Sequence, residues 1–208
     1  GRRLAGWAAD RGAEALVLAG RSADPGLAEV LSGEFGVPVR IVAADVSTEA
    51  GVAAMLAAAD GLPPLRTVVH AAGVQAPGLL AELGEAELWA ALAAKATGAE
   101  LLDRATRGPG LDYFILVSSI ASVLGAAGQG GYAAANAFLD ALARRRRAEG
   151  LPALSVAWGR WAEAGMAGEL DDAARQRVEA LGILAMDDAA ALQALDLALT
   201  GGLVDPVV

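Results

Sequence analysis

The chain has 208 residues, of which 55% are hydrophobic and 20% are charged, so it can bury a sizeable core and is not of the disordered class. Its net charge of −9 argues against nucleic acid as a partner, the lack of cysteine excludes disulfides and thiolate chemistry, and the single histidine excludes a multi-histidine metal site. No apolar run reaches membrane-spanning length and no signal peptide is visible, so we expect a cytoplasmic protein without a membrane partner.

Strand-like apolar runs alternate with helix-like runs along the whole chain. Helices are predicted at 1–11, 28–35, 50–59, 85–106, from Tyr132 onward, within 163–184 and at 187–200. Strands are predicted at 15–19, 37–43, 66–70, 113–117 and 152–158, and another begins near Val208. This alternation predicts an α/β fold with right-handed βαβ units, a doubly wound parallel sheet and helices on both of its faces.

Small and polar residues follow the carboxyl ends of these predicted strands. They are Arg21, Asp45, Gly73, Ser119 and the pair Trp158 and Gly159. Ligands of open parallel sheets bind beyond the carboxyl ends of the strands, so these residues predict the edge at which a site lies.

The stretch 111–147 carries the most specific pattern. Ser118 and Ser119 end its strand, a glycine-rich loop follows at 125–131, and Tyr132 then begins an alanine-rich helix. Asn136 lies four residues after Tyr132, hence on the same helix face. A serine at a strand tip followed by a tyrosine and an asparagine on one helix predicts a catalytic site. Core packing of the tyrosine and a turn at the serines are the alternative interpretation.

Together these segments resemble the short-chain dehydrogenase/reductase superfamily and, within it, the ketoreductase domains of modular type I polyketide synthases. The matching segments occur in the family's order over essentially the whole chain: 69–74 (VHAAGV), 95–99 (KATGA), 117–121 (VSSIA), Gly128 and Gln129 with 132–140 (YAAANAFLD), and 157–159 (AWG) with Trp161, Gly165 and Met166. Most superfamily members have lysine four residues after the tyrosine. Here that position is Asn136 and the lysine is Lys95, as in polyketide ketoreductases. The resemblance implies a Rossmann-like fold.

The resemblance also implies reduction of a β-ketoacyl thioester to a 3-hydroxyacyl thioester. Hydride transfer to a ketone creates an alkoxide that needs a proton, and a phenol can supply it when a nearby ammonium lowers the phenol pKa. Tyr132 is thus implied as the proton donor and Lys95 as the cation. Ser119 would donate a hydrogen bond to the ketone oxygen, with Ser118 as the alternative serine. Asn136 would hold Lys95 or a water relay in place.

NADPH is the cofactor that the resemblance implies. Arg21, with Ser22, stands where the family places a cation for the 2′-phosphate, and no acidic residue precedes Asp24 at that tip, which disfavours NAD. The other implied cofactor-binding residues are Gly1, Asp45, Val46, Ala71, Ala72 and Gly73. Glycine at position 73 would let the backbone approach the cofactor. His70, in the preceding strand, is expected to be a packed structural histidine.

Gly1 alone can correspond to the last glycine of the family's TGGxGxxG-type cofactor loop. We therefore expect residues 1–208 to be a single catalytic domain fragment from which the first strand and most of that loop are absent. In the family's strand order 3-2-1-4-5-6-7, this first strand is central, between the strands at 15–19 and 66–70. The 208 residues alone are expected neither to bind NADPH tightly nor to reduce ketones.

On the substrate side, the resemblance implies Gln129, Trp158, Gly159 and Met166 as contacts and the segment 161–184 as a lid. The Leu-Asp-Asp motif of B-type ketoreductases is absent, because 75–77 reads QAP, and Leu124 stands where A-type domains have tryptophan. These features lean toward the A-type.

The implied partners are an acyl carrier protein that bears the β-ketoacyl chain and other domains of the same synthase. The arginine run 144–147 is expected to be a solvated helix end, with a carrier-protein docking patch as the alternative. Two other functions stay open: a free-standing reductase of a small ketone or fatty acyl substrate, and a non-catalytic structural domain of a synthase.

Overall fold

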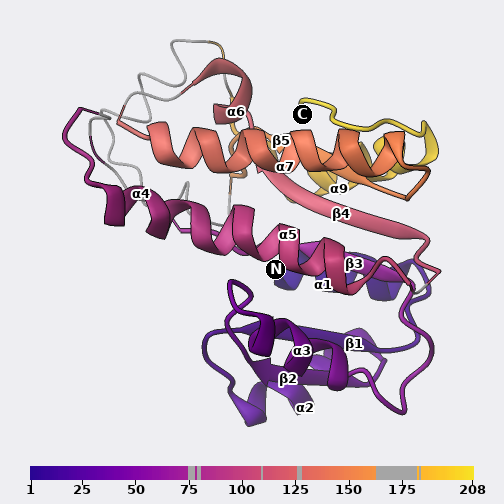
Figure 1. Cartoon of the computed structure of the whole chain (residues 1–208). Coiled ribbons are helices and arrows are strands. Elements are labelled where there is room, and N and C mark those ends of the chain that lie inside the picture. The colour runs from indigo at the N-terminus through magenta and orange to yellow at the C-terminus, as the bar shows by residue number, and fades with distance from the viewer. Residues whose placement is uncertain (75–77, 79–80, 109, 126–127, 163–181, 183) are drawn as a thin grey trace.

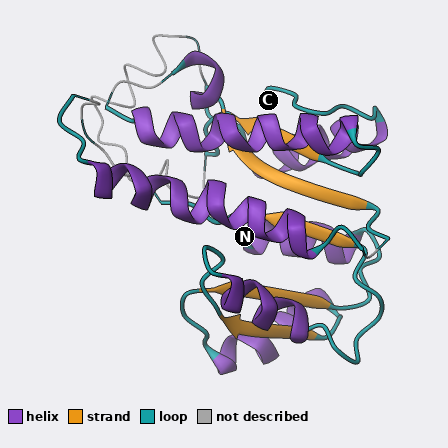
Figure 2. Cartoon of the chain, in the orientation of Figure 1, coloured by secondary structure: helices purple, strands orange, loops and turns teal. Residues whose placement is uncertain are grey.

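The structure is a computed structural model that describes residues 1–208 except 75–77, 79–80, 109, 126–127, 163–181 and 183 (Figure 1). In chain order the elements are α1 (Arg2–Asp10), β1 (Leu16–Gly20), α2 (Pro25–Phe35), β2 (Val39–Ala43), α3 (Glu49–Ala57), β3 (Thr67–His70), α4 (Glu85–Leu92), the π-helical turn η1 (Ala93–Thr97), α5 (Gly98–Ala105), β4 (Tyr113–Ser119), α6 (Ala121–Leu124), α7 (Gly130–Ala148), β5 (Leu154–Trp158) and α9 (Asp188–Thr200). Strands and helices alternate, as the sequence predicts (Figure 2). None of the helices described is long and apolar enough to cross a membrane.

Short polar side chains set where several helices begin. Thr48 accepts a hydrogen bond from the backbone N–H of Gly51 at the start of α3, at 3.0 Å, and Asp187 accepts one from Ala190 at the start of α9, at 2.7 Å. Such caps satisfy N–H groups that have no partner inside the helix. At the far end of α2, Gly36 has a φ of 68°, which favours glycine and stops the helix.

All strand pairs in the two sheets are parallel. β1 pairs with β2, and β3, β4 and β5 form a second sheet in that order. The carboxyl-terminal segment continues the second sheet beyond β5, because the N–H of Ser155 donates to Val204 O at 2.7 Å and that of Ala157 to Pro206 O at 2.9 Å. The predicted doubly wound parallel architecture is therefore confirmed.

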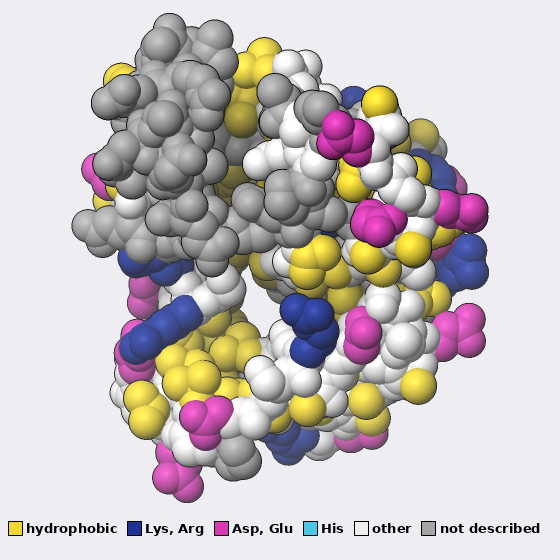
Figure 3. All heavy atoms as spheres, turned by 90° about the vertical axis from the view of Figure 1, so that its left-hand side faces the viewer, with side chains coloured by type: hydrophobic (Ala, Val, Ile, Leu, Met, Phe, Trp, Pro, Cys, Tyr) yellow, Lys and Arg dark blue, Asp and Glu magenta, His cyan; other side chains and the backbone are white. Residues whose placement is uncertain are grey.

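The sheet is divided between β1 and β3. In the part of the chain that the structure describes, these two strands belong to separate sheets and share no ladder. Figure 3 shows an opening through the molecule between the half with β1 and β2 and the half with β3, β4 and β5. This is where the family's strand order puts a further strand, which stays a prediction.

Helices cover both faces of the sheet around β4. Successive residues of a strand point to opposite faces, and the core is accordingly split into two clusters. Phe114 and Leu116 pack with residues of α3, α5 and α7, such as Leu139, whereas Ile115 packs with residues of α1 and α9, such as Leu195. β4 is thus buried between two helical layers, and its carboxyl end is fixed in position.

The arginine run at the end of α7 is not a solvated helix end throughout. Arg146 is 1% exposed, forms an ion pair with the buried Asp103 of α5 and lies with its guanidinium carbon 3.9 Å from the ring centroid of Phe114. Arg145 pairs with Glu100 at 2.7 Å. The expectation of a solvated run is wrong for Arg146, because α5 provides a buried carboxylate that compensates its desolvation.

Candidate active site

Lys95 lies on a π-helical turn rather than on a continuous α-helix. The predicted helix 85–106 is divided into α4, η1 and α5, and Lys95 is in the middle of η1. Single π-turns inside helices occur frequently at functional sites. His70 fixes this turn, since its Nε2 lies 3.1 Å from the backbone oxygen of Lys95. The result is a lysine that points inward and is only 3% exposed.

The lysine ammonium reaches β4 and the tyrosine of α7. Lys95 Nζ donates to Val117 O at 2.8 Å and lies 5.6 Å from the ring centroid of Tyr132. A Cβ on Gly73 would lie 2.7 Å from Lys95 Cε, so glycine at 73 makes room for the lysine. The structure therefore brings together the implied cation and the implied proton donor, and it gives Gly73 a role that sequence reasoning missed.

Burial decides the protonation of the two basic groups in this region. It lowers the pKa of Lys95 to about 8, and the negative charge of Asp140 opposes this shift. Burial and then the charge of Lys95 lower the pKa of His70 to about 4, so the imidazole is neutral at pH 7. Since the carbonyl of Lys95 can only accept, His70 Nε2 carries the proton and donates. His70 thus has a structural role, as expected.

Asn136 joins the tyrosine helix to β4. It is fully buried, and its Nδ2 donates to the backbone oxygen of Tyr132 at 2.8 Å. Ser118 Oγ donates to the backbone oxygen of Asn136 at 3.3 Å. Among the described residues, Asn136 Oδ1 has no hydrogen-bond partner although it is buried. The side chain therefore holds Tyr132 and retains one free acceptor, and its implied contact with Lys95 stays a prediction.

The two serines at the end of β4 differ in their surroundings. Ser118 is 3% exposed and its hydroxyl bonds the backbone of α7. Ser119 is half-buried at the last position of the strand, and its Oγ accepts a hydrogen bond from Ala121 N at 3.2 Å. The hydroxyl of Ser118 already donates its hydrogen to the backbone of α7, so this geometry favours Ser119 as the serine of the site.

The implied cofactor residues follow the first two strands. Arg21 and Ser22 are exposed directly after β1, and Asp45 follows β2. Asp45 accepts from Ser47 N at 2.9 Å and Ser47 Oγ at 2.6 Å, and these bonds, with a smaller contribution from the charge of Arg21, lower the pKa of the carboxyl. Arg21 and Asp45 are thus near each other at the carboxyl edge of the sheet.

The KR domain family matches residues 1–163. The chain belongs to this family. It is 48% identical over 207 residues to the polyketide synthase GfsA of Streptomyces halstedii, an alignment that covers 97% of this chain and 3% of that protein. It is 46% identical over 182 residues to the pikromycin polyketide synthase component PikAIII of Streptomyces venezuelae, which covers 85% of this chain and 12% of that one. The chain therefore spans a small part of these relatives.

Solved ketoreductase structures have the same fold. A structure of A-type ketoreductases from a modular polyketide synthase is 43% identical with a TM-score of 0.92 and covers 100% of this chain and 44% of that one. The ketoreductase from the first module of phoslactomycin biosynthesis in Streptomyces sp. HK803 is 45% identical with a TM-score of 0.88, and it covers 100% of this chain and 49% of that one. Membership of this family implies a nicotinamide cofactor.

Four further cofactor candidates of this KR domain differ in exposure. Val46 is buried in the core, with 8% of its surface exposed. It packs against α5, because a Cβ on Gly98 would lie 2.8 Å from Val46 Cγ1. Ala71 is exposed and Ala72 is half-buried after β3. Gly1 is exposed at the amino terminus of α1. Their contacts with a cofactor stay predictions.

The implied substrate residues lie on two sides of the site. Gln129 directly precedes α7 and makes no capping hydrogen bond with its side chain. Its loop meets the segment after β3, where Gly78 N donates to Gly128 O at 2.8 Å. Trp158 is 5% exposed and packs edge-on against Trp161, with the ring centroids 5.1 Å apart. Trp158 is therefore part of the core. The N–H of Gly159 donates a hydrogen bond to the backbone oxygen of Val208, at 2.6 Å. Met166 and most of the implied lid lie outside the described residues.

Asp140 is a buried carboxylate near the site that sequence reasoning did not single out. Its carboxylate is 6% exposed and accepts hydrogen bonds from Ser122 Oγ and Ser155 Oγ, both at 2.6 Å. The signal was present, because Asp140 follows Asn136 by four residues and thus shares the face of α7 that carries Tyr132.

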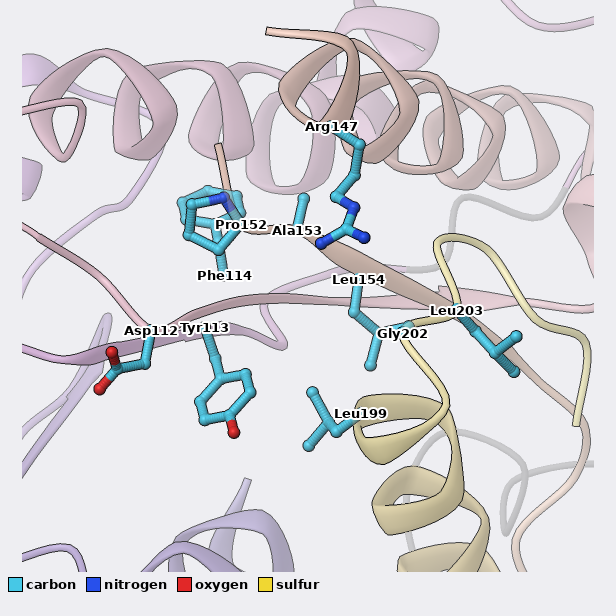
Figure 4. A pocket seen from close by; sticks show the side chains of 10 residues that line it. All are labelled: Asp112, Tyr113, Phe114, Arg147, Pro152, Ala153, Leu154, Leu199, Gly202 and Leu203. Atoms are coloured by element: carbon cyan, nitrogen blue, oxygen red, sulfur yellow. The ribbon is translucent and has the colours of Figure 1, made fainter. Parts of the chain in front are cut away.

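A small pocket at the opposite edge of the sheet is separate from this site. It lies among the amino ends of β4 and β5, the exposed Arg147 and the chain after α9 (Figure 4). Its lining includes Tyr113 and Leu154, whereas Ser119 and Trp158 end the same strands at the other edge. The chemistry-bearing residues therefore do not coincide with this pocket.

Proposed function

We propose that this chain is the catalytic part of a ketoreductase domain in a modular polyketide synthase and reduces a β-ketoacyl thioester carried by an acyl carrier protein, with NADPH as cofactor. The observation that carries the proposal is the buried ammonium of Lys95 beside the ring of Tyr132, at the strand end that bears Ser119. The KR family match and the similarity to polyketide synthases support this over a free-standing reductase. The assembled side chains support it over a structural domain.

The chemistry adds a hydride and a proton across a ketone. When bound, the nicotinamide cofactor supplies the hydride. The hydroxyl of Ser119 donates a hydrogen bond to the ketone oxygen, which stabilises the negative charge that develops there. Tyr132 transfers its hydroxyl proton to this oxygen, so the product is an alcohol, and the charge of Lys95 stabilises the phenolate until solvent returns a proton. Asn136 keeps Tyr132 in place through the backbone.

Arg21 supports NADPH as the form of the cofactor. Its guanidinium is exposed at the carboxyl end of β1 and makes no ion pair with the described residues. A guanidinium can bind a phosphate through two parallel hydrogen bonds, which suits the additional 2′-phosphate of NADPH. Ser22 can add a hydroxyl from the next position.

An A-type outcome, with an L-configured 3-hydroxyacyl product, is the stereochemical part of the proposal. Two similar solved structures are named as A-type and A1-type ketoreductases, at 43% and 42% identity. Leu124, at the place of the A-type tryptophan, is 63% exposed on α6, which begins two residues after Ser119. This exposure leaves it available to a substrate.

The test is a reduction assay on the ketoreductase domain of the natural protein. A diketide β-ketoacyl thioester is supplied with NADPH, NADPH oxidation is followed, and the alcohol is resolved by chiral chromatography. We expect NADPH-dependent formation of the L-alcohol. A D-alcohol would overturn the A-type assignment alone, and a folded domain that oxidises no NADPH would overturn the proposed function.

A further inference from the structure

Two cations and two carboxylates are buried among the described residues of this domain. Arg146 forms an ion pair with Asp103, which also pairs with the partly exposed Arg107 and Arg145. Lys95 and Asp140 are left as the other buried cation and the other buried carboxylate. A buried charge is strongly disfavoured unless an opposite charge or hydrogen bonds compensate it. The balance of buried charges therefore indicates that Asp140 compensates the charge of Lys95.

The positions of both groups in the sheet support this relation. Asp140 Oδ1 accepts from Ser155, which lies opposite Leu116 in the β4–β5 register. The next residue of β4, Val117, provides the carbonyl that binds Lys95 Nζ. Adjacent strands are about 5 Å apart, so the anchors of the ammonium and of the carboxylate are neighbours in the sheet.

The hydrogen bonds of Asp140 also hold the elements around the site. Both oxygens accept serine hydroxyls, a pattern that suits the ionised carboxylate. Ser122 belongs to α6, which begins two residues after Ser119, and Ser155 belongs to β5. One carboxylate on α7 thus connects the serine side of the site to the tyrosine helix.

We propose that Asp140 is a positioning residue of the active site, whose carboxylate is the counter-charge of Lys95 and holds α6 and β5 around it. This inference rests on the proposed function. The titratable groups of the described elements that interact with Lys95 are His70 of β3, which is neutral, Tyr132 of α7 and, through its charge and without an ion pair, Asp140 of α7. Asp140 is the negative charge among them, and it counteracts the lowering of the Lys95 pKa by burial.

The first test is the pH profile of kcat/KM for Asp140→Asn, a substitution that keeps the shape and removes the charge. Because Lys95 acts as the ammonium, we expect the alkaline limb of the profile to move by about one pH unit to lower pH. The matched control is Ser155→Ala, which removes one hydrogen bond and leaves the carboxylate; its limb should not move to lower pH. A folded Asp140→Asn domain with the wild-type limb would overturn the proposal, because a merely structural role lowers stability alone.

A second measurement does not depend on activity. Lys95 is the one lysine of the 208-residue sequence. In the ketoreductase domain, lysine labelled at Cε with an NMR-active carbon isotope gives a signal for Lys95 that is identified by its loss in Lys95→Arg. We expect this signal to titrate near pH 8 in the wild-type domain and at lower pH in Asp140→Asn or, should that variant not fold, in Asp140→Ser. Equal titration in the wild-type and the variant would overturn the proposal. A domain that reduces no ketone but shows the shifted lysine would overturn the proposed function alone.

Discussion

His70 should make the domain sensitive to mild acid. The buried imidazole has a pKa lowered from 6.5 to about 4, so between these values the unfolded chain binds a proton that the folded chain does not. The stabilising contribution of neutral His70 is therefore complete above pH 6.5 and is lost as the pH falls through about 4. A shift of this size corresponds to about 3 kcal/mol in total and about 2 kcal/mol by pH 5.

Urea unfolding at about pH 7.5 and pH 5, followed by tryptophan fluorescence, measures this loss. The control is His70→Gln, whose side-chain amide can still donate to the oxygen of Lys95. The sequence has one histidine, and the lowered carboxyl pKa values of Asp45, Asp103 and Asp196 place their effects below this pH window. We expect the wild-type domain to lose about 2 kcal/mol more than the variant. Equal losses in both would refute the reasoning from burial.

Three other changes test separate parts of the structure. Gly73→Ala places a methyl group 2.7 Å from Lys95 Cε and should reduce kcat by at least about tenfold, whereas Gly33→Ala, at an open helical position, should leave it unchanged; steady-state kinetics compare the two. Arg21→Ala should weaken the binding of NADPH by about 1.5–3 kcal/mol and the binding of NADH much less, as measured by calorimetric titration. An equal loss of binding free energy for both cofactors would show that Arg21 does not discriminate between them. In the part of the chain that the structure describes, the divided sheet leaves the facing edges of β1 and β3 without ladder partners. Unpaired strand edges are templates for association, so residues 1–208 alone should bind NADPH weakly and aggregate. Saturable micromolar binding by that chain would contradict this.

The sequence predicts the layer architecture and the central pair of the site because both depend on short-range patterns. β4 and α7 follow from an apolar run and an alanine-rich helix, and the spacing of Tyr132 and Asn136 places both on one face of α7. The division of the sheet between β1 and β3 has another source: it was expected from the strand order of the family that the chain resembles, and not from local pattern.

Other features depend on contacts between distant segments. The π-turn at Lys95 was not predicted. It includes five residues, and so short a wider turn leaves the spacing of apolar residues along 85–106 nearly unchanged. Burial of Arg146 depends on Asp103, which lies 43 positions earlier in the chain. The role of Asp140 depends on Ser155 of another strand. Local pattern contains no information about such partners.

The most direct test of the central claim, that Tyr132 beside Lys95 is the proton donor, is the turnover of Tyr132→Phe in the ketoreductase domain. The sequence has two tyrosines, and Tyr113, 44% exposed at the opposite end of β4, offers the same chemical change as a control. We expect Tyr132→Phe to lower kcat about 10²–10⁴-fold with NADPH affinity within about twofold, and Tyr113→Phe to leave kcat unchanged. Near-normal turnover of a β-ketoacyl thioester by the Tyr132→Phe domain would contradict the account.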